Sequence, residues 1–399
     1  MNGPPVENGA VAISGNRIDA VGEFREITRG SGAQEIIDLG EQALLPGLIN
    51  SHCHLDYTCL RGKIPPPKSF TEWIRAINAE KTRLSPIEYV SSIIEGFAEA
   101  QAFGTTTIAN LTAFPELIPE VSEPIRTWWF GELIDVRNPE RANEIVDLAV
   151  ERLKAAKHWG LAPHAPFTAS SNLYEGCQEL VRRENILPTT HLAESREEMQ
   201  MFRNASGPLY DFLKEIGRDM GDCGGKTPAA HFLSMAAGDQ RAIEVSRPYL
   251  IVHLNELIES DYELLERWRS RFSIVHCPRS HAYFEHSPFP FERLREIGFN
   301  ICLATDSLAS NEDLSLFGEM RAFRENFANV SAEEIVAMVT RNSARALSQE
   351  GKLGKIAEGF AADLIAIPCE RLSEVFEEIL LYAQPIAWSI RNGTLKNRL

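Results

Sequence analysis

Short apolar runs separated by longer amphipathic segments make up most of the chain. The runs that we interpret as strands are Leu45–His52, Thr105–Asn110, Arg126–Leu133, Gly160–His164, Ile186–His191, Tyr249–His253, Phe272–His276 and Phe299–Asp306. Segments with helical periodicity lie between them, including Pro86–Phe103, Glu140–Lys157, Asn172–Glu184, Asp261–Arg271 and Pro290–Gly298. Continuous apolar strands that alternate with helices predict a parallel sheet covered on both faces. Eight such units predict a (β/α)8 barrel over residues 45–349, with an open doubly wound sheet as the alternative.

Both ends of the chain show a different pattern, in which apolar and polar residues alternate around turn pairs. The first is "VAISGNRIDAVG", with Gly15-Asn16 as the turn, and the second is "PIAWSIRNGTL", with Asn392-Gly393. Such pairs favour β-hairpins. We therefore expect one small β-sandwich domain built from residues 1–44 and 350–399. The connection from Leu192 to Pro248 is long and contains helical pieces, which predicts an elaborated loop over the barrel mouth.

The charge and the cysteines narrow the class of protein. A formal net charge of -16 disfavours nucleic acid and anionic membranes as partners, because binding phosphates requires surplus Lys and Arg. No apolar stretch is long enough to span a bilayer, and the N-terminus does not have the pattern of a secretory signal. The seven cysteines form no CxxC pair, which is typical of reduced thiols in a cytoplasmic protein. We expect a small-molecule substrate, and we consider a homodimer as the oligomeric state.

Histidines gather at the ends of the predicted strands. Six of the ten are found there: His52, His54, His164, His191, His253 and His276, and Asp306 follows the last strand. In a parallel barrel the carboxyl ends of the strands converge on one face, where active sites are built. His52 and His54 point to the same side of one strand, whereas Cys53 points away. With His191 and Asp306 as third and fourth ligands, this donor set suits Zn or Fe(II) with one open position for water.

A carboxylate follows the third of these ligands at a distance that suits acid–base chemistry. Glu194 lies three residues beyond His191 and could reach a water on the metal, as a general acid or base would. The alternative is a solvated residue in the first turn of a helix. His253 is either a further ligand or the group that holds the reacting oxygen. The remaining histidines are assigned as a substrate contact at His164, as packing or loop-fixing residues at His276 and His281, and as structural residues at His158, His231 and His286.

Several motifs resemble the amidohydrolase superfamily, in particular its branch of deaminases and chlorohydrolases, which includes methylthioadenosine/S-adenosylhomocysteine and aminodeoxyfutalosine deaminases. The motifs are "PGLINSHCHLD", "HLAES", "HCPRSH", "ATDSLASNEDLSLFGEM" and "GKIAEGFAADLIAI", and together they cover nearly the whole chain. The resemblance implies one divalent metal ion, zinc or alternatively iron, bound by His52, His54, His191 and Asp306. It also implies that Glu194 is the proton shuttle and that His253 orients the reacting oxygen. Asp306 would accept the proton of the attacking water.

The resemblance further implies contacts to substrate. His164 would contact the sugar of a nucleoside, the segment Ser69–Ile74 would close over the substrate, and Glu80 and Arg137 would hold ribose hydroxyls or a carboxylate. The fourth strand has no lysine in "GLAPHAPFT", so a mononuclear site is expected. His281, in a loop that would lie near the substrate, is a further candidate contact; it departs from the Ser-Asn pair that is usual in the branch, which leaves the exact substrate open. We expect a hydrolytic deaminase of an aminated heterocycle, an adenine nucleoside first, with a chlorohydrolase or a cyclic-amide or imidazolone hydrolase as alternatives.

Overall fold

A barrel of parallel strands is the main body of the protein. The structure, a computed structural model, describes residues 4–30, 35–66, 68–236 and 247–397. Eight strands follow the order β11-β10-β9-β8-β7-β6-β5-β4, and each neighbouring pair is parallel. Their bounds are β4 Leu48–Cys53, β5 Thr105–Thr112, β6 Arg126–Leu133, β7 Trp159–Pro163, β8 Leu187–Leu192, β9 Tyr249–His253, β10 Phe272–His276 and β11 Asn300–Leu303. The first strand, β4, meets the segment that follows the last strand, β11. There Asn50 Nδ2 donates to Thr305 Oγ1 at 2.8 Å, and Cys53 forms a parallel bridge with Asp306.

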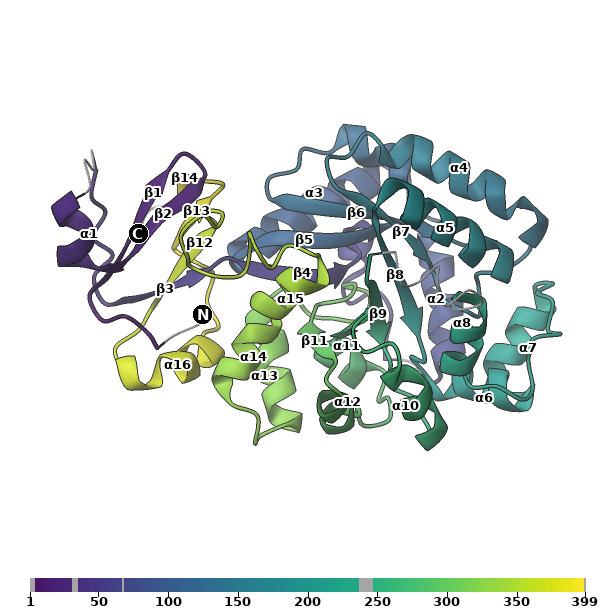
Figure 1. The fold of residues 1–399 in the computed structure, drawn as a ribbon. Coiled ribbons are helices and arrows are strands. Elements are labelled where there is room, and N and C mark those ends of the chain that lie inside the picture. Colours follow the sequence, from purple (N-terminus) through teal and green to yellow (C-terminus); the bar gives the residue numbers. More distant parts are fainter. Residues whose placement is uncertain (1–3, 31–34, 67, 237–246, 398–399) are drawn as a thin grey trace.

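Helices surround this sheet on the outside (Figure 1). Serine side chains begin several of them: the Ser85 hydroxyl accepts from the Glu88 amide, and the Glu88 carboxylate accepts from the Ser85 amide at 2.8 Å. This capping box satisfies backbone groups that the first turn leaves unpaired. The helices are α2 Phe70–Lys81, α3 Pro86–Ala102, α4 Ala142–Leu153, α5 Ser171–Glu184, α6 Arg196–Asn204, α7 Pro208–Glu215, α8 Pro228–Ala236, α10 Glu259–Glu266, α11 Pro278–Tyr283, α12 Phe291–Ile297, α13 Leu316–Asn326, α14 Ala332–Met338 and α15 Arg341–Ala346. The predicted (β/α)8 barrel is confirmed.

A smaller β structure, formed by the two ends of the described chain, lies to one side of the barrel (Figure 1). Its four-stranded antiparallel sheet has the order β14-β13-β12-β3, and a separate hairpin pairs β1 with β2. Ile18 of the hairpin packs into one buried cluster with Leu364 and Trp388 of the sheet. The elements are β1 Gly9–Ser14, β2 Arg17–Glu23, α1 Phe24–Gly30, β3 Gln42–Pro46, β12 Leu364–Pro368, α16 Val375–Leu381, β13 Trp388–Arg391 and β14 Thr394–Asn397. Both predicted hairpin turns are present, and the two packed sheets confirm the predicted sandwich.

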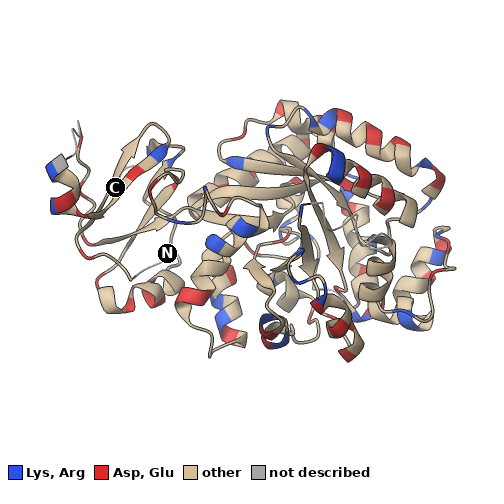
Figure 2. Ribbon diagram, in the orientation of Figure 1, with Lys and Arg blue, Asp and Glu red and all other residues tan. Residues whose placement is uncertain are grey.

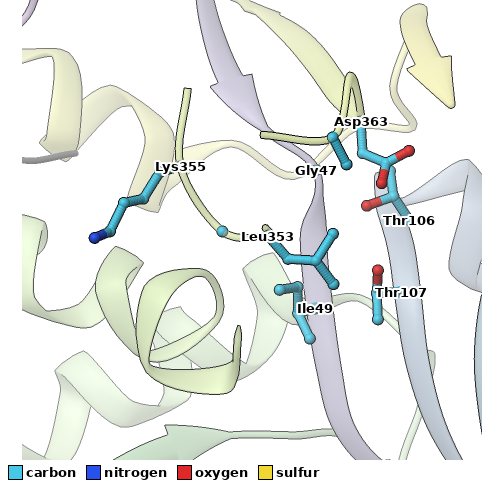
Figure 3. Close-up of a pocket in the computed structure, with 9 residues that line it drawn as sticks. Gly47, Ile49, Thr106, Thr107, Leu353, Lys355 and Asp363 are labelled. Atoms are coloured by element: carbon cyan, nitrogen blue, oxygen red, sulfur yellow. The ribbon is translucent and has the colours of Figure 1, made fainter. Parts of the chain in front are cut away.

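The junction between the two parts divides a run that the sequence analysis treats as one strand. β3 belongs to the small sheet and β4 to the barrel, so the predicted strand Leu45–His52 is interrupted at Gly47. A Cβ at Gly47 would lie 2.2 Å from the Thr106 side chain, so only glycine allows this close passage. A pocket opens beside Gly47, with Thr107 and Lys355 among its lining residues (Figure 3). This pocket lies at the start of β4, whereas His52 lies near the other end of that strand. The predicted domain boundary at residue 44 falls within β3 and stays a prediction.

The long connection after β8 contains α6, α7 and α8, and its residues 237–246 lie outside the described part. Glu197 of α6 accepts hydrogen bonds from the amides of Phe70 and Thr71 at 3.0 Å each, so this connection is fastened to the start of α2. Charged residues of both signs are interspersed on the outer helices, and the barrel strands are largely uncharged (Figure 2). Of the helices described, none combines the length and apolar character that crossing a membrane requires.

Candidate metal centre and acid–base site

Three imidazoles and a carboxylate converge at the carboxyl end of the barrel. The ring centroids of His52 and His54 are 4.9 Å apart, and those of His52 and His191 are 5.0 Å apart. Potential ligand atoms of these three histidines all lie within 4.8 Å of one another. Asp306 Oδ1 is 3.5 Å from His52 Nε2 and 3.8 Å from His54 Nε2. The structure thus brings together the four residues predicted as ligands.

Three residues at or just beyond the carboxyl ends of the barrel strands have left-handed backbone conformations. His253 and Asp306 have φ values of 76° and 58°, in the left-handed region that non-glycine residues rarely adopt. Ala193, between His191 and Glu194, has a φ of 50°. Such conformations cost of order 1–3 kcal/mol each and persist only where the surroundings enforce them. Their concentration around the histidines is typical of a functional site.

The donor set fits one divalent metal ion. Both ring nitrogens of His52 are buried and have no hydrogen-bond partner in the described structure, and a metal ion would give one of them a partner. Burial lowers the pKa of His54 to about 3, which keeps its ring neutral and able to coordinate. Burial alone would raise the pKa of Asp306, but the neighbouring imidazoles of His52, His253 and His54 hold the pKa of this carboxyl group well below its usual range. Neutral imidazoles with an ionised carboxylate are typical Zn and Fe(II) ligands.

The geometry also limits the number of ions. His191 Nδ1 donates to the backbone oxygen of His164 at 2.9 Å, which leaves only Nε2 for a metal. A second grouping, in which Glu132, His164 and His191 come within 4.8 Å, would need that same nitrogen. One imidazole nitrogen binds one ion, so the two groupings exclude each other. These two groupings can therefore hold only one ion between them, and a third grouping, of His253, Cys277 and Asp306, shares Asp306 with the candidate ligands.

Glu194 lies beside the imidazoles with its carboxyl group buried. Its Oε1 is 3.6 Å from His253 Nε2, and its backbone is fixed because its amide donates to Glu198 at 2.7 Å and its carbonyl accepts from Asn255 at 3.0 Å. Burial raises the pKa of Glu194 to about 8; the His191 ring opposes this shift, and the Asp306 charge adds to it. Near pH 7 the side chain is therefore a neutral carboxylic acid that can donate a proton. A solvated glutamate, the alternative considered from the sequence, does not fit this burial.

The other predicted site residues divide into two groups. His164 lies at the site, with Nδ1 2.6 Å from Thr168 Oγ1, and His281 is half-buried next to His276, with 5.2 Å between the ring centroids. Glu80 forms an ion pair with Arg83, and Arg137 is exposed in the segment after β6. Their contacts to substrate stay predictions, because the described structure joins neither to the histidines. His276 stacks on Phe289 at 3.9 Å, which suits packing.

Two residues at the site were not singled out from the sequence. Glu132, near the end of β6, has Oε1 3.8 Å from His54 Nδ1 and 4.0 Å from His164 Nε2. His286, which the sequence analysis leaves as structural, has Nε2 3.8 Å from Glu194 Oε1. Glu132 carries a signal that could have revealed it, since it is a lone charge at the end of an apolar strand. His286 follows a helix and has no comparable signal.

Comparisons with known proteins agree with this geometry. The model of the amidohydrolase family matches residues 43–385. The chain is 29% identical to a 5-methylthioadenosine/S-adenosylhomocysteine deaminase of Syntrophobacter fumaroxidans, over 100% of this chain and 89% of the relative. The aminofutalosine deaminase of Helicobacter pylori, solved with methylthio-coformycin, has a TM-score of 0.85 at 22% identity, covering 98% of this chain and 95% of its own. An adenosine deaminase of Xanthomonas campestris with bound zinc has a TM-score of 0.78 at 23% identity, covering 98% and 89%. The chain belongs to the amidohydrolase family and is a metal-dependent hydrolase.

Proposed function

We propose that the protein is a hydrolytic deaminase that replaces an amino group on a heterocycle with oxygen and releases ammonia, and that its substrate is an adenine nucleoside. The observation that carries the proposal is Glu194, a buried carboxyl group that lies beside the candidate metal ligands with its Oε1 3.6 Å from His253 Nε2, and whose pKa is raised by burial. Hydrolysis of an amino-substituted ring needs such a proton donor for the ring nitrogen. The deaminase names of the relatives described above support the same reaction.

The metal in this proposal is a single zinc ion held by His52, His54, His191 and Asp306. The unpartnered nitrogens of His52 support this, as does the zinc bound in the related fold from Xanthomonas campestris. When bound, the ion would lower the pKa of a water molecule and so supply the nucleophile near neutral pH.

The side chains of this site divide the proton transfers among them. Glu194 gives its proton to the ring nitrogen next to the amino-bearing carbon, which makes that carbon electrophilic. Asp306, which is ionised, accepts the proton that the attacking water loses, while Ser280 Oγ donates to its Oδ2 at 2.8 Å and holds the carboxylate. His253 lies on the Glu194 side and donates to the oxygen that develops on the attacked carbon. Asp306 then passes the proton that it took from water to the amino group, which leaves as ammonia, and the hydroxyl proton on the attacked carbon returns to Glu194.

Aromatic and polar side chains beside these groups suit a nucleoside. Phe70 and Phe167 meet edge to face with their centroids 6.4 Å apart, and Phe167 contacts the His164 ring at 5.7 Å. Apolar rings favour a planar base. Glu132 and His164, on the next strand ends, offer an acceptor and an imidazole to sugar hydroxyls. The cytoplasmic location and the homodimer stay predictions from the sequence.

The test is a substrate panel with paired product assays. Purified protein with its metal content measured is incubated with adenine nucleosides, free purines, pterins and chlorinated triazines, and ammonia and chloride are both quantified. The expected result is stoichiometric ammonia release, fastest with adenine nucleosides. Release of chloride without ammonia, or ring opening without ammonia, would overturn the proposal.

A further inference from the structure

His286 lies between α11 and α12 and places its ring against the proton donor of the site. Its side chain is 5% exposed, and its Nε2 is 3.8 Å from Glu194 Oε1. His253 Nε2 is 3.6 Å from the same oxygen, so one carboxyl oxygen faces two imidazole nitrogens. Within the described structure, His286 Nε2 has no hydrogen-bond partner. A small movement of either side chain would bring it into hydrogen-bonding distance of Glu194.

The segment that carries His286 is fixed on both sides of the ring. Arg196 Nε donates to Ser287 Oγ at 2.9 Å, and the Ser287 amide donates to Glu256 Oε1 at 3.4 Å. Phe284 stacks on the imidazole with a centroid distance of 5.1 Å. Glu285, between them, has a φ of 52°, a conformation that a non-glycine residue adopts only under constraint. The chain is thus bent and anchored in a way that directs His286 inward.

Packing alone does not account for a histidine in this place. A phenylalanine would fill the same space against Phe284 and Phe70, which lies at a centroid distance of 6.1 Å, without burying a polar nitrogen. A buried polar atom without a partner is destabilising by about 1–3 kcal/mol. The carboxyl oxygen of Glu194, 3.8 Å away, is an acceptor that can satisfy this nitrogen.

We propose that His286 is a positioning residue for Glu194: a hydrogen bond between its Nε2 and Oε1 fixes the carboxyl group in the orientation that directs its proton at the substrate ring. The inference deepens the proposed function and rests on it wherever turnover is measured. It does not require His286 to touch the substrate or to change its own charge.

The test compares His286→Phe and His286→Gln with Glu194→Gln and the double variant. Phenylalanine keeps the ring packing, and glutamine restores an amide nitrogen near the position of Nε2. We expect His286→Phe to lower kcat about 10- to 100-fold with KM and metal content changed less than about threefold, and His286→Gln to recover at least about tenfold of the loss. Because His286 acts through Glu194, the double variant should be no slower than Glu194→Gln alone. His158→Phe, which alters a histidine stacked on Trp128 at the opposite end of the barrel, is the matched control and should keep kcat within about twofold.

Three results would overturn the inference: multiplicative losses in the double variant, a rise in KM with kcat unchanged, or equal losses for phenylalanine and glutamine. A measurement that does not depend on turnover separates this inference from the proposed function. The carboxylic acid stretch of Glu194, identified by infrared difference against Glu194→Gln, should shift in His286→Phe and return in His286→Gln. If the wild type deaminates nothing but this shift is seen, only the proposed function fails. If deamination is seen without the shift, the role of His286 is wrong.

Discussion

Replacing Glu194 with glutamine should stop catalysis and stabilise the metal-free protein at the same time. Glutamine keeps the shape of the side chain and leaves the backbone hydrogen bonds to Glu198 and Asn255 in place, but it has no acidic proton to transfer. Removal of a general acid typically lowers turnover about 10²- to 10⁴-fold. Because none of the candidate ligands is changed, the metal content should stay the same.

The gain in stability follows from the pKa of Glu194, which burial raises from 4.5 to about 8. For a carboxyl group whose pKa is higher in the folded state, the folded protein binds more protons than the unfolded chain, so stability falls as pH rises from about 4.5 to about 8. At about 1.4 kcal/mol per pKa unit, the carboxyl group costs about 3 kcal/mol of stability at pH 7 and less than about 1 kcal/mol at pH 5. Glutamine removes this cost.

Urea unfolding of both metal-free proteins at the two pH values measures the difference, and ammonia release by the zinc-loaded proteins measures activity. The expected pattern is a stabilisation that is clear at pH 7 and small at pH 5, together with the loss of turnover. An equal effect at both pH values would show that burial does not hold this group neutral. Turnover within tenfold of the wild type would refute its role as proton donor.

Further expectations concern the metal, the pH profile, the substrate and the barrel wall. Chelation of the metal should abolish turnover and lower the unfolding midpoint, and added zinc should restore both. An ion that binds only the folded state, present at 100 times its Kd, adds about 2.7 kcal/mol to the free energy of unfolding. Restoration of activity without zinc uptake would contradict this expectation. The kcat/KM profile should fall above pH 8 as Glu194 loses its proton, whereas a profile that stays flat well above pH 8 would refute the assignment. Glu132→Ala should raise KM for a ribonucleoside about 10- to 100-fold by removing a carboxyl acceptor beside His164, and it should leave KM for the free base unaffected. Equal losses for both substrates would argue against a sugar contact. Gly160→Ala would place a Cβ 2.3 Å from the backbone oxygen of Leu187, so we expect urea unfolding to show a destabilisation of about 1–3 kcal/mol. An unfolding midpoint equal to that of the wild type would show that β7 and β8 can move apart at this position.

Strands buried on both faces could be located closely from the sequence, because their apolar runs end at charged or turn residues. Tyr249–His253 and Phe272–His276 have the predicted bounds. The last predicted strand, Phe299–Asp306, is shorter in the structure because β11 ends at Leu303 and Asp306 adopts a left-handed conformation. Apolar pattern alone cannot show such a departure, since the residues that leave the sheet remain buried and keep an apolar neighbourhood.

The candidate metal ligands could be found because topology alone brings them together: residues at the carboxyl ends of parallel strands meet wherever the strands lie in the sequence. Glu132 could have been found from the alternation of inward and outward side chains along β6. Trp128 and Phe130 belong to the cluster inside the barrel, whereas Trp129 and Leu133 face the helices, so the two-residue period of β6 directs Glu132 inward at the catalytic end. This alternation would therefore have revealed Glu132 as a residue of the site. His286 is different, because its approach to Glu194 depends on a strained loop and on anchors from Arg196 and Glu256, which no periodicity encodes. Sequence patterns can thus predict the residues that regular elements deliver to a site, whereas residues delivered by loops have to be found in the structure.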